Sequence, residues 1–412
     1  MEMGKPNRRK RSTGGTENGA GIAGTTGDPD CGRKQKLADI HRALISDPVD
    51  IQALRRAAAT RGGLLNNEMR RKVWPKLLNI NVFDLPHRPG RNGREKHTDF
   101  QQVVLDVKRS MKRFPKGMPA AERDALQEQL IDIILEVLKR NSQLHYYQGY
   151  HDVAVTLLLV VGERMAMAML EKLSNHHLRD FMDTTMDSTK HILNYLMPIL
   201  EQVDAELHDF MTRAEVGTIF ALSWLITWFG HVLSEFKHTL RLYDFFLASH
   251  PLMPIYLAAT IVLHREQEVK QTECDMAMVH HLLAHIPEDL PFELLIGRAQ
   301  GLFDCFPPPL LAKQAALQSR NSLSISSFQA FQLSTLHQRP DSVLQRLTRT
   351  RSSASCRHDV RAVAGDDGEL WRQGNRIVKV AVWGLSATLG AAVFAVAQTA
   401  MDWGPEAFLQ LF

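Results

Sequence analysis

Two clusters of polar side chains stand out because each lies within otherwise apolar, helix-like sequence. The first is Val103-x-x-Asp106-x-x-Arg109, whose spacing places the carboxylate and the guanidinium on one helical face, where they can pair. The second is residues 141–152, in which amide, phenol and carboxylate groups surround a single glycine, Gly149. Taken alone, the first cluster is typical of a local ion pair and the second of a loop, so neither names a reaction.

Other patterns resemble catalytic motifs without completing them. His281-Leu-Leu-Ala-His285 has the spacing of two zinc ligands on a helix, but the glutamate that would act as general base is missing. We therefore expect capping or core-lining histidines and no metal site, and a membrane-bound metallo-hydrolase stays open only as a remote alternative. Residues 27–33 resemble a phosphate-binding loop with arginine in place of the required lysine, which argues against a nucleotide site.

The elements that must position these residues are helices. Apolar residues recur at intervals of three and four in residues 126–138 and again in residues 192–207, which is the periodicity of helices that face a core. No run of alternating β-branched residues and no hairpin turn between two strand patterns accompanies them. We therefore expect an all-α domain over residues 37–311, long enough to bury a sizeable core.

The flanks of this predicted domain differ from it in charge and composition. The whole chain has a net charge of +4, but the excess of Lys and Arg lies in the flanks and residues 37–311 are mildly acidic. Nucleic acid is therefore a disfavoured partner, since a nucleic-acid-binding domain concentrates positive charge on its folded part. Residues 1–36 are predicted to be a disordered basic and Gly-rich arm. Residues 312–376 are predicted to be a Ser/Gln/Arg-rich linker, with a short helix near residues 325–347.

The strongest composition signal lies near the C-terminus. Residues 380–401 contain no formally charged side chain, and as a helix they would extend about 33 Å, enough for a bilayer core of about 30 Å. Basic residues precede this stretch and acidic residues follow it, so the positive-inside rule places the large N-terminal part in the cytosol. We predict a transmembrane tail anchor over residues 377–401 and a short luminal tail over residues 402–412. The alternative is a buried core helix.

Several sequence blocks together resemble the signatures of a known family. In chain order the blocks are Arg70-x-x-x-Trp74-Pro75-x-Leu77, Val103-x-x-Asp106-x-x-Arg109, Tyr146-x-Gln148-Gly149 followed by Asp152, Ser223-Trp224 with Phe229, and Arg241-Leu242-Tyr243-Asp244. They are similar, in type and in order, to the signature blocks of the TBC domain family, the activators of Rab-type small GTPases. One block could match by chance, whereas this series over residues 70–244 indicates a helical TBC-type domain.

The resemblance assigns roles to individual residues. It implies that Arg109 is an arginine finger and Gln148 a glutamine finger, which stands in for the glutamine of the GTPase itself. It also implies that Asp106 steers Arg109. Tyr146, Gly149 and Asp152 would support the Gln148 loop, and the structural residues of the motifs would be Trp74, Arg241 and Asp244.

The same resemblance implies the function and the partners. The chain would accelerate GTP hydrolysis by a Rab-family GTPase of the early secretory pathway, from the cytosolic face of the endoplasmic reticulum membrane. It would need no cofactor of its own, because GTP and Mg²⁺ are bound by the partner GTPase, and it would catalyse no independent reaction. The alternative is a membrane-anchored scaffold that binds Rab proteins without activating hydrolysis.

Overall fold

The structure is a computed structural model that describes residues 29–110, 114, 117–314 and 322–348. Within these ranges the secondary structure is helical throughout and contains no strand, as the sequence predicts. The helices up to the middle of the chain are α1 (Pro29–Ile45), α2 (Ile51–Ala59), α3 (Asn67–Leu77), η1 (Arg94–Lys96), α4 (Phe100–Arg109), α5 (Ala120–Arg140), α6 (Tyr150–Val161), α7 (Glu163–Asn175) and η3 (Arg179–Met182).

The later helices complete the domain. They are α8 (Asp187–Leu193), α9 (Leu196–Val203), α10 (Ala205–Arg213), η4 (Ile219–Ala221), α11 (Leu222–Ile226), α12 (Phe236–Ala248), α13 (Met253–His264), α14 (Glu266–Gln271), α15 (Met276–Ala284), α16 (Phe292–Cys305), α17 (Pro308–Gln314) and α18 (Leu323–Ser334). Helix α5 contains the apolar stripe of residues 126–138, and its buried face includes Leu130, Ile134 and Leu138. The predicted helix in this region is therefore confirmed.

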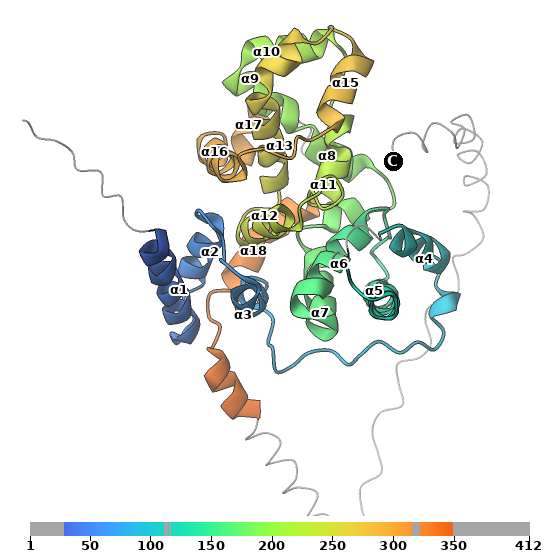
Figure 1. Ribbon diagram of the computed structural model, residues 1–412, viewed down its shortest axis with the longest axis vertical. Helices are drawn as coiled ribbons and strands as arrows, with labels where there is room; N and C mark the ends of the chain where they lie inside the picture. Colours follow the sequence, from blue (N-terminus) through green and yellow to red (C-terminus); the bar gives the residue numbers. More distant parts are fainter. Residues whose placement is uncertain (1–28, 111–113, 115–116, 315–321, 349–412) are drawn as a thin grey trace, which may run out of the picture. The chain divides into compact units, whose positions relative to one another are not determined.

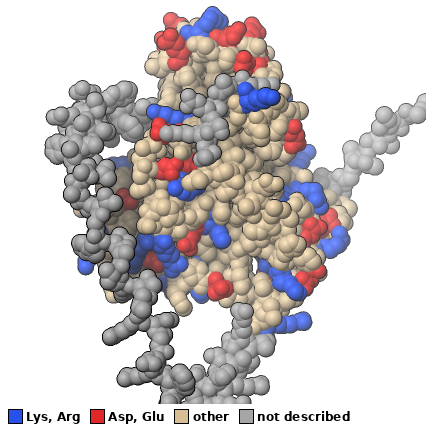
Figure 2. All heavy atoms as spheres, turned by 180° about the vertical axis from the view of Figure 1, so that it is seen from behind, with Lys and Arg blue, Asp and Glu red and all other residues tan. Residues whose placement is uncertain are grey.

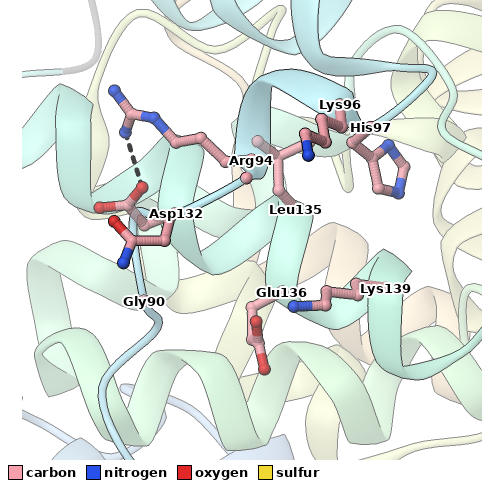
Figure 3. Close-up of a pocket in the computed structure, with 10 residues that line it drawn as sticks. Gly90, Arg94, Lys96, His97, Asp132, Leu135, Glu136 and Lys139 are labelled. Atoms are coloured by element: carbon pink, nitrogen blue, oxygen red, sulfur yellow. Dashed lines mark hydrogen bonds and ion pairs between the residues drawn. The ribbon is translucent and has the colours of Figure 1, made fainter.

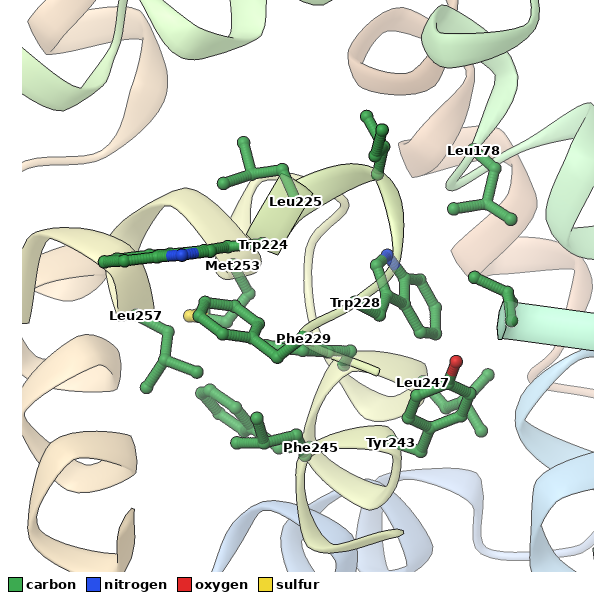
Figure 4. Packing of buried hydrophobic residues seen from close by; sticks show 14 of the residues in the cluster. Leu178, Trp224, Leu225, Trp228, Phe229, Tyr243, Phe245, Leu247, Met253 and Leu257 are labelled. Atoms are coloured by element: carbon green, nitrogen blue, oxygen red, sulfur yellow. The ribbon is translucent and has the colours of Figure 1, made fainter. Parts of the chain in front are cut away.

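The helices that carry the two polar clusters pack together. α5, α6 and α7 lie against one another, and α4 packs against α5 and α6 (Figure 1). α12 packs on α2 and α3, whereas α13 packs on α9 and α16. A buried aromatic cluster of Trp224, Trp228, Phe229, Tyr243 and Phe245 joins α11, α12 and the turn between them (Figure 4). This cluster fixes the end of α11 and the turn after it, which contact Gly149 and Tyr147 of the second polar cluster.

The periodic stretch 192–207 is not the single helix that its spacing suggests. It belongs to α8, α9 and α10, with breaks near Asn194 and at Asp204. Pro198 lies in the first turn of α9 and lacks the N–H with which a continuous helix would bond Asn194. The Asp204 side chain accepts a hydrogen bond of 2.9 Å from the Leu207 N–H and so begins α10. The proline and the cap therefore break the helix although the apolar periodicity of the sequence continues.

The folded part extends beyond both boundaries that composition suggests. α1 begins at Pro29, so the last eight positions of the predicted arm 1–36 are helical. Within the predicted linker 312–376, α18 and a helical stretch at 341–348 are ordered, and α18 packs against η3. The short helix that the sequence predicts near residues 325–347 falls on α18 and this stretch, and Phe328 and Phe331 of α18 are buried against the domain.

The helices of the described ranges can be compared with the length and hydropathy of a membrane span. Among the residues that the structure describes, no helix combines the length and the hydropathy that crossing a bilayer requires. The predicted anchor 377–401, the tail 402–412 and residues 1–28 lie outside the described ranges.

On the face drawn in Figure 2, Lys and Arg side chains are interspersed with Asp and Glu around a broad uncharged area. This face therefore carries no continuous basic patch.

Candidate functional site

Arg109 is the last residue of α4 and projects into solvent. Helix α4 buries Val103 and Val107, which directs the side chain of Arg109 away from the core, where it is 62% exposed. Its Nη1 atom lies 3.8 Å from Oδ1 of Asp106, at the outer limit of an ion pair. The guanidinium is therefore only loosely held and is accessible to a partner.

Asp106 lies one turn earlier and is 1% exposed. Its Oδ1 accepts a hydrogen bond of 3.0 Å from the Gln102 amide, and its Oδ2 accepts one of 2.9 Å from the Tyr146 hydroxyl. These contacts are shorter than the one to Arg109, so Asp106 holds the loop of the second polar cluster more closely than it holds the arginine. The hydrogen bond to Tyr146 joins α4 directly to that loop.

Tyr146 stays a hydrogen-bond donor over the physiological range. Burial raises the pKa of its phenol well above the ordinary value, and the nearby carboxylate of Asp106 raises it further. The protonated hydroxyl is thus available to the buried carboxylate. The same hydroxyl lies 3.4 Å from Nδ1 of His151, the second residue of α6.

The loop that carries Gln148 connects α5 to α6 and is held at several points. The backbone N–H of His145 donates to the carbonyl of Met182 at 2.9 Å. The hydroxyl of Tyr147 donates to the carbonyl of Ile226 at 2.9 Å. Gln148 itself is half-buried between these anchors and the start of α6. Because the backbone on both sides of Gln148 is fixed, the position of its side chain depends on η3 and on the turn after α11.

Gly149 allows that turn to approach. Its φ of 102° is in the left-handed region, and a Cβ atom there would lie 2.8 Å from Cγ2 of Thr227. The turn after α11 is itself unusual, since Trp228 and Phe229 have φ values of 48° and 61°. The aromatic cluster of Figure 4 holds both side chains in place. The glycine is therefore required for close packing as well as for the backbone conformation.

Asp152 lies in the first turn of α6 and is buried. Nδ1 of His231 lies 3.3 Å from its Oδ2, and Nε2 of His151 lies 3.8 Å from the same atom. Sequence reasoning missed both histidines. His151 is inside the polar run and could have been singled out, whereas His231 lies far along the chain and gives no local signal. Asp152 thus joins the loop to the turn after α11.

The motif residues Trp74, Arg241 and Asp244 lie in a buried network, and the hydrogen bonds and ion pairs that hold it do not include Arg109 or Gln148. Asp244 accepts hydrogen bonds from Trp74 Nε1 at 2.8 Å, from Arg70 Nε at 3.0 Å and from Arg70 Nη2 at 2.9 Å. Arg241 donates to the carbonyl of Ala58 at 3.1 Å and pairs with a glutamate of α16. These contacts tie α2, α3, α12 and α16 together, which is a structural use of the residues.

The histidine pair of the sequence analysis lies at the end of α15, where the ring centroids of His281 and His285 are 4.7 Å apart. Nδ1 of His285, the residue that follows the last turn of α15, lies 2.8 Å from the carbonyl of His281. No group of three or more potential metal ligands is found in the described ranges. A cavity of about 220 Å³ lies between the loop around η1 and α5, where Arg94 pairs with Asp132 at 2.6 Å (Figure 3). None of the predicted site residues lines this cavity.

Comparison with known proteins agrees with the motifs. Residues 67–270 match the family model described as the Rab-GTPase-TBC domain. The chain is 61% identical over 381 residues to human TBC1 domain family member 20, covering 92% of this chain and 93% of that protein. It is 32% identical over 278 residues to GTPase-activating protein gyp10 of Schizosaccharomyces pombe, covering 66% of this chain and 74% of that protein.

A solved structure supports the fold independently. The crystal structure of the Ypt/Rab-GAP domain of Gyp1p superposes with a TM-score of 0.54 at 15% sequence identity, covering 66% of this chain and 99% of that one. At this identity the likeness concerns the helical architecture alone.

Proposed function

Because the chain belongs to the Rab-GTPase-TBC domain family and is thereby a Rab GTPase-activating protein, we propose that it supplies Arg109 and Gln148 to the active site of a GTP-bound Rab. The observation that carries this proposal is the hydrogen bond between Tyr146 and Asp106, which links the helix of Arg109 to the loop of Gln148. The helix that carries Arg109 and the loop that carries Gln148 are thereby held to each other. The partner GTPase would contribute the nucleotide and Mg²⁺.

Arg109 fits the role of an arginine finger. Negative charge develops on the γ-phosphate oxygens during hydrolysis, and a guanidinium donates two hydrogen bonds there without losing its proton. Such a residue typically contributes about 10³- to 10⁵-fold in rate. The exposed side chain at the end of α4 can reach a partner, and its loose pairing with Asp106 leaves little to break on binding.

Gln148 fits the role of orienting the attacking water. A carboxamide accepts a hydrogen bond from water through its oxygen and donates one through its nitrogen, so it orients a nucleophile without removing a proton. Precise placement matters for such a group, since a small displacement is costly in rate. The anchors at His145, Tyr147 and Gly149 supply that precision.

Single-turnover GTP hydrolysis across a panel of Rab proteins tests this proposal. We expect the full chain to accelerate one or two Rabs, with those of the early secretory pathway as the proposed substrates. Arg109→Ala and Gln148→Ala are each expected to lose that acceleration while the melting temperature stays unchanged. Lys108→Ala, which removes the same charge from the adjacent exposed position, is the matched control and is expected to retain kcat.

The results of this assay distinguish a GTPase activator from a scaffold that binds Rab proteins without activating hydrolysis. Normal acceleration by Arg109→Ala would contradict the arginine finger. No acceleration of any Rab by the folded wild-type chain, together with binding to GTP-loaded Rab, would favour the alternative of a scaffold without activity.

We further propose that residues 377–401 anchor the chain in the endoplasmic reticulum membrane, with the TBC domain in the cytosol. The support is the uncharged stretch 380–401 and its flanking charges. Confinement to the membrane that also holds a lipidated Rab would raise the effective concentration of both partners.

Carbonate extraction of cell membranes tests the anchor. We expect the full chain to stay in the pellet and a chain lacking residues 377–412 to be released. Deletion of residues 402–412 alone is the control and should leave the protein in the pellet. Retention of the longer deletion in the membrane would refute the anchor.

A further inference from the structure

Helix α18 lies outside the region that matches the family model, yet it docks firmly on the domain. The buried carboxylate of Asp180 in η3 accepts hydrogen bonds from the first residues of α18. Its Oδ1 accepts a hydrogen bond of 3.0 Å from the backbone N–H of Leu323, and its Oδ2 bonds the hydroxyl of Ser322. Ser322 also accepts from the Ile325 N–H at 3.1 Å, so it caps α18 at the same point.

The apolar face of α18 rests on a group of aromatic rings. Phe331 is 5% exposed, and its ring centroid lies 4.3 Å from that of His176 and 5.8 Å from that of His177. Phe328 lies 5.8 Å from the His177 ring and 4.9 Å from the His250 ring. α18 therefore covers the segment between α7 and η3.

One line of contacts runs from this docking point to the Gln148 loop through η3. The three consecutive residues Asp180, Phe181 and Met182 are all buried. Asp180 holds α18, the ring of Phe181 lies 6.1 Å from that of Tyr147, and the carbonyl of Met182 accepts the His145 N–H at 2.9 Å. A shift of η3 would therefore move the loop on the N-terminal side of Gln148.

A second line of contacts reaches the other side of Gln148. The His177 ring meets Trp228 edge to face at 6.0 Å. Trp228 follows Thr227, whose methyl group packs against Gly149. The carbonyl of Ile226, one residue earlier, accepts the hydroxyl of Tyr147. Both flanks of Gln148 thus depend on parts of the chain that α18 covers.

We propose that α18 is a positioning strut for the Gln148 loop, with Asp180 and His177 as the positioning residues through which it acts. The inference rests on the proposed role of Gln148 in hydrolysis. It assigns a part in activation to a segment beyond the matched domain. None of these residues contacts the GTPase in this scheme, so the strut affects the rate at saturation and leaves the affinity for the Rab unchanged.

Variants of α18 test the strut. Phe331→Leu keeps an apolar side chain but loses the ring contacts, and Ser322→Ala removes both the cap of α18 and the hydroxyl that bonds Asp180. Leu333→Ala is the matched control, because Leu333 is on the same helix and is 57% exposed. In the full chain, the first two variants should lower kcat by about tenfold or more at unchanged KM, since displacement of a catalytic group by 1 Å can cost on the order of 100-fold.

A measurement of folding separates positioning from general damage. The assay is run at a temperature at which circular dichroism shows each variant to be fully folded, so that a loss of kcat reports displacement of the Gln148 loop and not unfolding. Unchanged kcat in the folded Phe331→Leu and Ser322→Ala variants, or an equal loss in Leu333→Ala, would overturn the inference.

Amide hydrogen exchange provides a readout that does not depend on the GTPase. Exchange at the His145 amide should be faster in Phe331→Leu and Ser322→Ala than in Leu333→Ala. Unchanged exchange would overturn the strut whatever the activity. Faster exchange with Gln148→Ala fully active would instead uphold the strut and reject the proposed role of Gln148.

Discussion

Replacing Gly149 by alanine should damage both the fold and the activity, and the structure separates two causes. The first is the backbone, since an L-residue at a φ of 102° and a ψ of −17° costs about 1–2 kcal/mol. The second is contact, because the new Cβ would lie 2.8 Å from Cγ2 of Thr227, well inside the carbon–carbon optimum of about 3.5–4.0 Å. Such overpacking costs about 1–3 kcal/mol.

Thr227 cannot easily move away. Its hydroxyl donates to the carbonyl of Ser223 at 2.6 Å and accepts from the His231 N–H at 3.2 Å. We therefore expect Gly149→Ala to lower the free energy of unfolding by about 2–5 kcal/mol, the sum of the two costs. The Gln148 side chain should also be displaced, with a loss of kcat.

Gly93→Ala is the matched control for the backbone cost. Gly93 has a similar conformation, with a φ of 79° and a ψ of 7°, and a Cβ atom there would meet nothing within 4 Å. Thr227→Ser isolates the contact cost, because it removes Cγ2 and keeps the hydroxyl. In the Gly149→Ala background it should restore about 1–3 kcal/mol.

Urea denaturation of the full-length variants measures these differences, and single-turnover hydrolysis follows the activity. Equal destabilisation by Gly149→Ala and Gly93→Ala would refute the contact argument. Failure of Thr227→Ser to restore stability to the Gly149→Ala chain would refute it as well.

Other perturbations test the remaining parts of the site and the core. Tyr146→Phe deprives the buried Asp106 carboxylate of a donor and should cost about 1–3 kcal/mol in urea denaturation, with a lower kcat. Asp244→Asn leaves the buried Arg70 guanidinium without its charge partner, so thermal denaturation should show a loss of about 3–5 kcal/mol. Burial lowers the pKa of His177 to about 3 and that of His250 to about 4. Because the unfolded histidines bind protons below pH 6.5 and the folded ones do not until their own pKa is reached, stability should fall on acidification by up to about 1.4 kcal/mol per pH unit for each histidine between pH 6 and about 5. Equal stability at pH 7.5 and pH 4.5 would contradict this assignment.

The sequence predicts the helical class and several helices well because their apolar periodicity is local information. Residues 126–138 become the buried face of α5, as their spacing indicates. The stretch 192–207 fails as one helix because Pro198 and the cap at Asp204 act on individual hydrogen bonds that periodicity does not register. Composition averages over α18, where two buried phenylalanines and one serine cap are enough to dock a segment rich in polar residues.

The site was predictable only in part, for a similar reason. Asp106 and Tyr146 could be singled out by type, but their mutual hydrogen bond joins residues 40 positions apart and required the fold. His231 is recruited to Asp152 by the turn after α11, which depends on positive φ values at Trp228 and Phe229. Spacing along the chain carries no information about such contacts.

In the proposed mechanism this chain provides a glutamine, Gln148, that replaces the one in the GTPase. The most direct test is single-turnover hydrolysis by a responsive Rab whose own catalytic glutamine has been changed to alanine. We expect the wild-type chain to accelerate this Rab nearly as well as the unmodified one, and Gln148→Ala to accelerate neither. Loss of acceleration on the altered Rab, with full acceleration of the unmodified Rab by the same wild-type protein, would show that Gln148 does not perform this role.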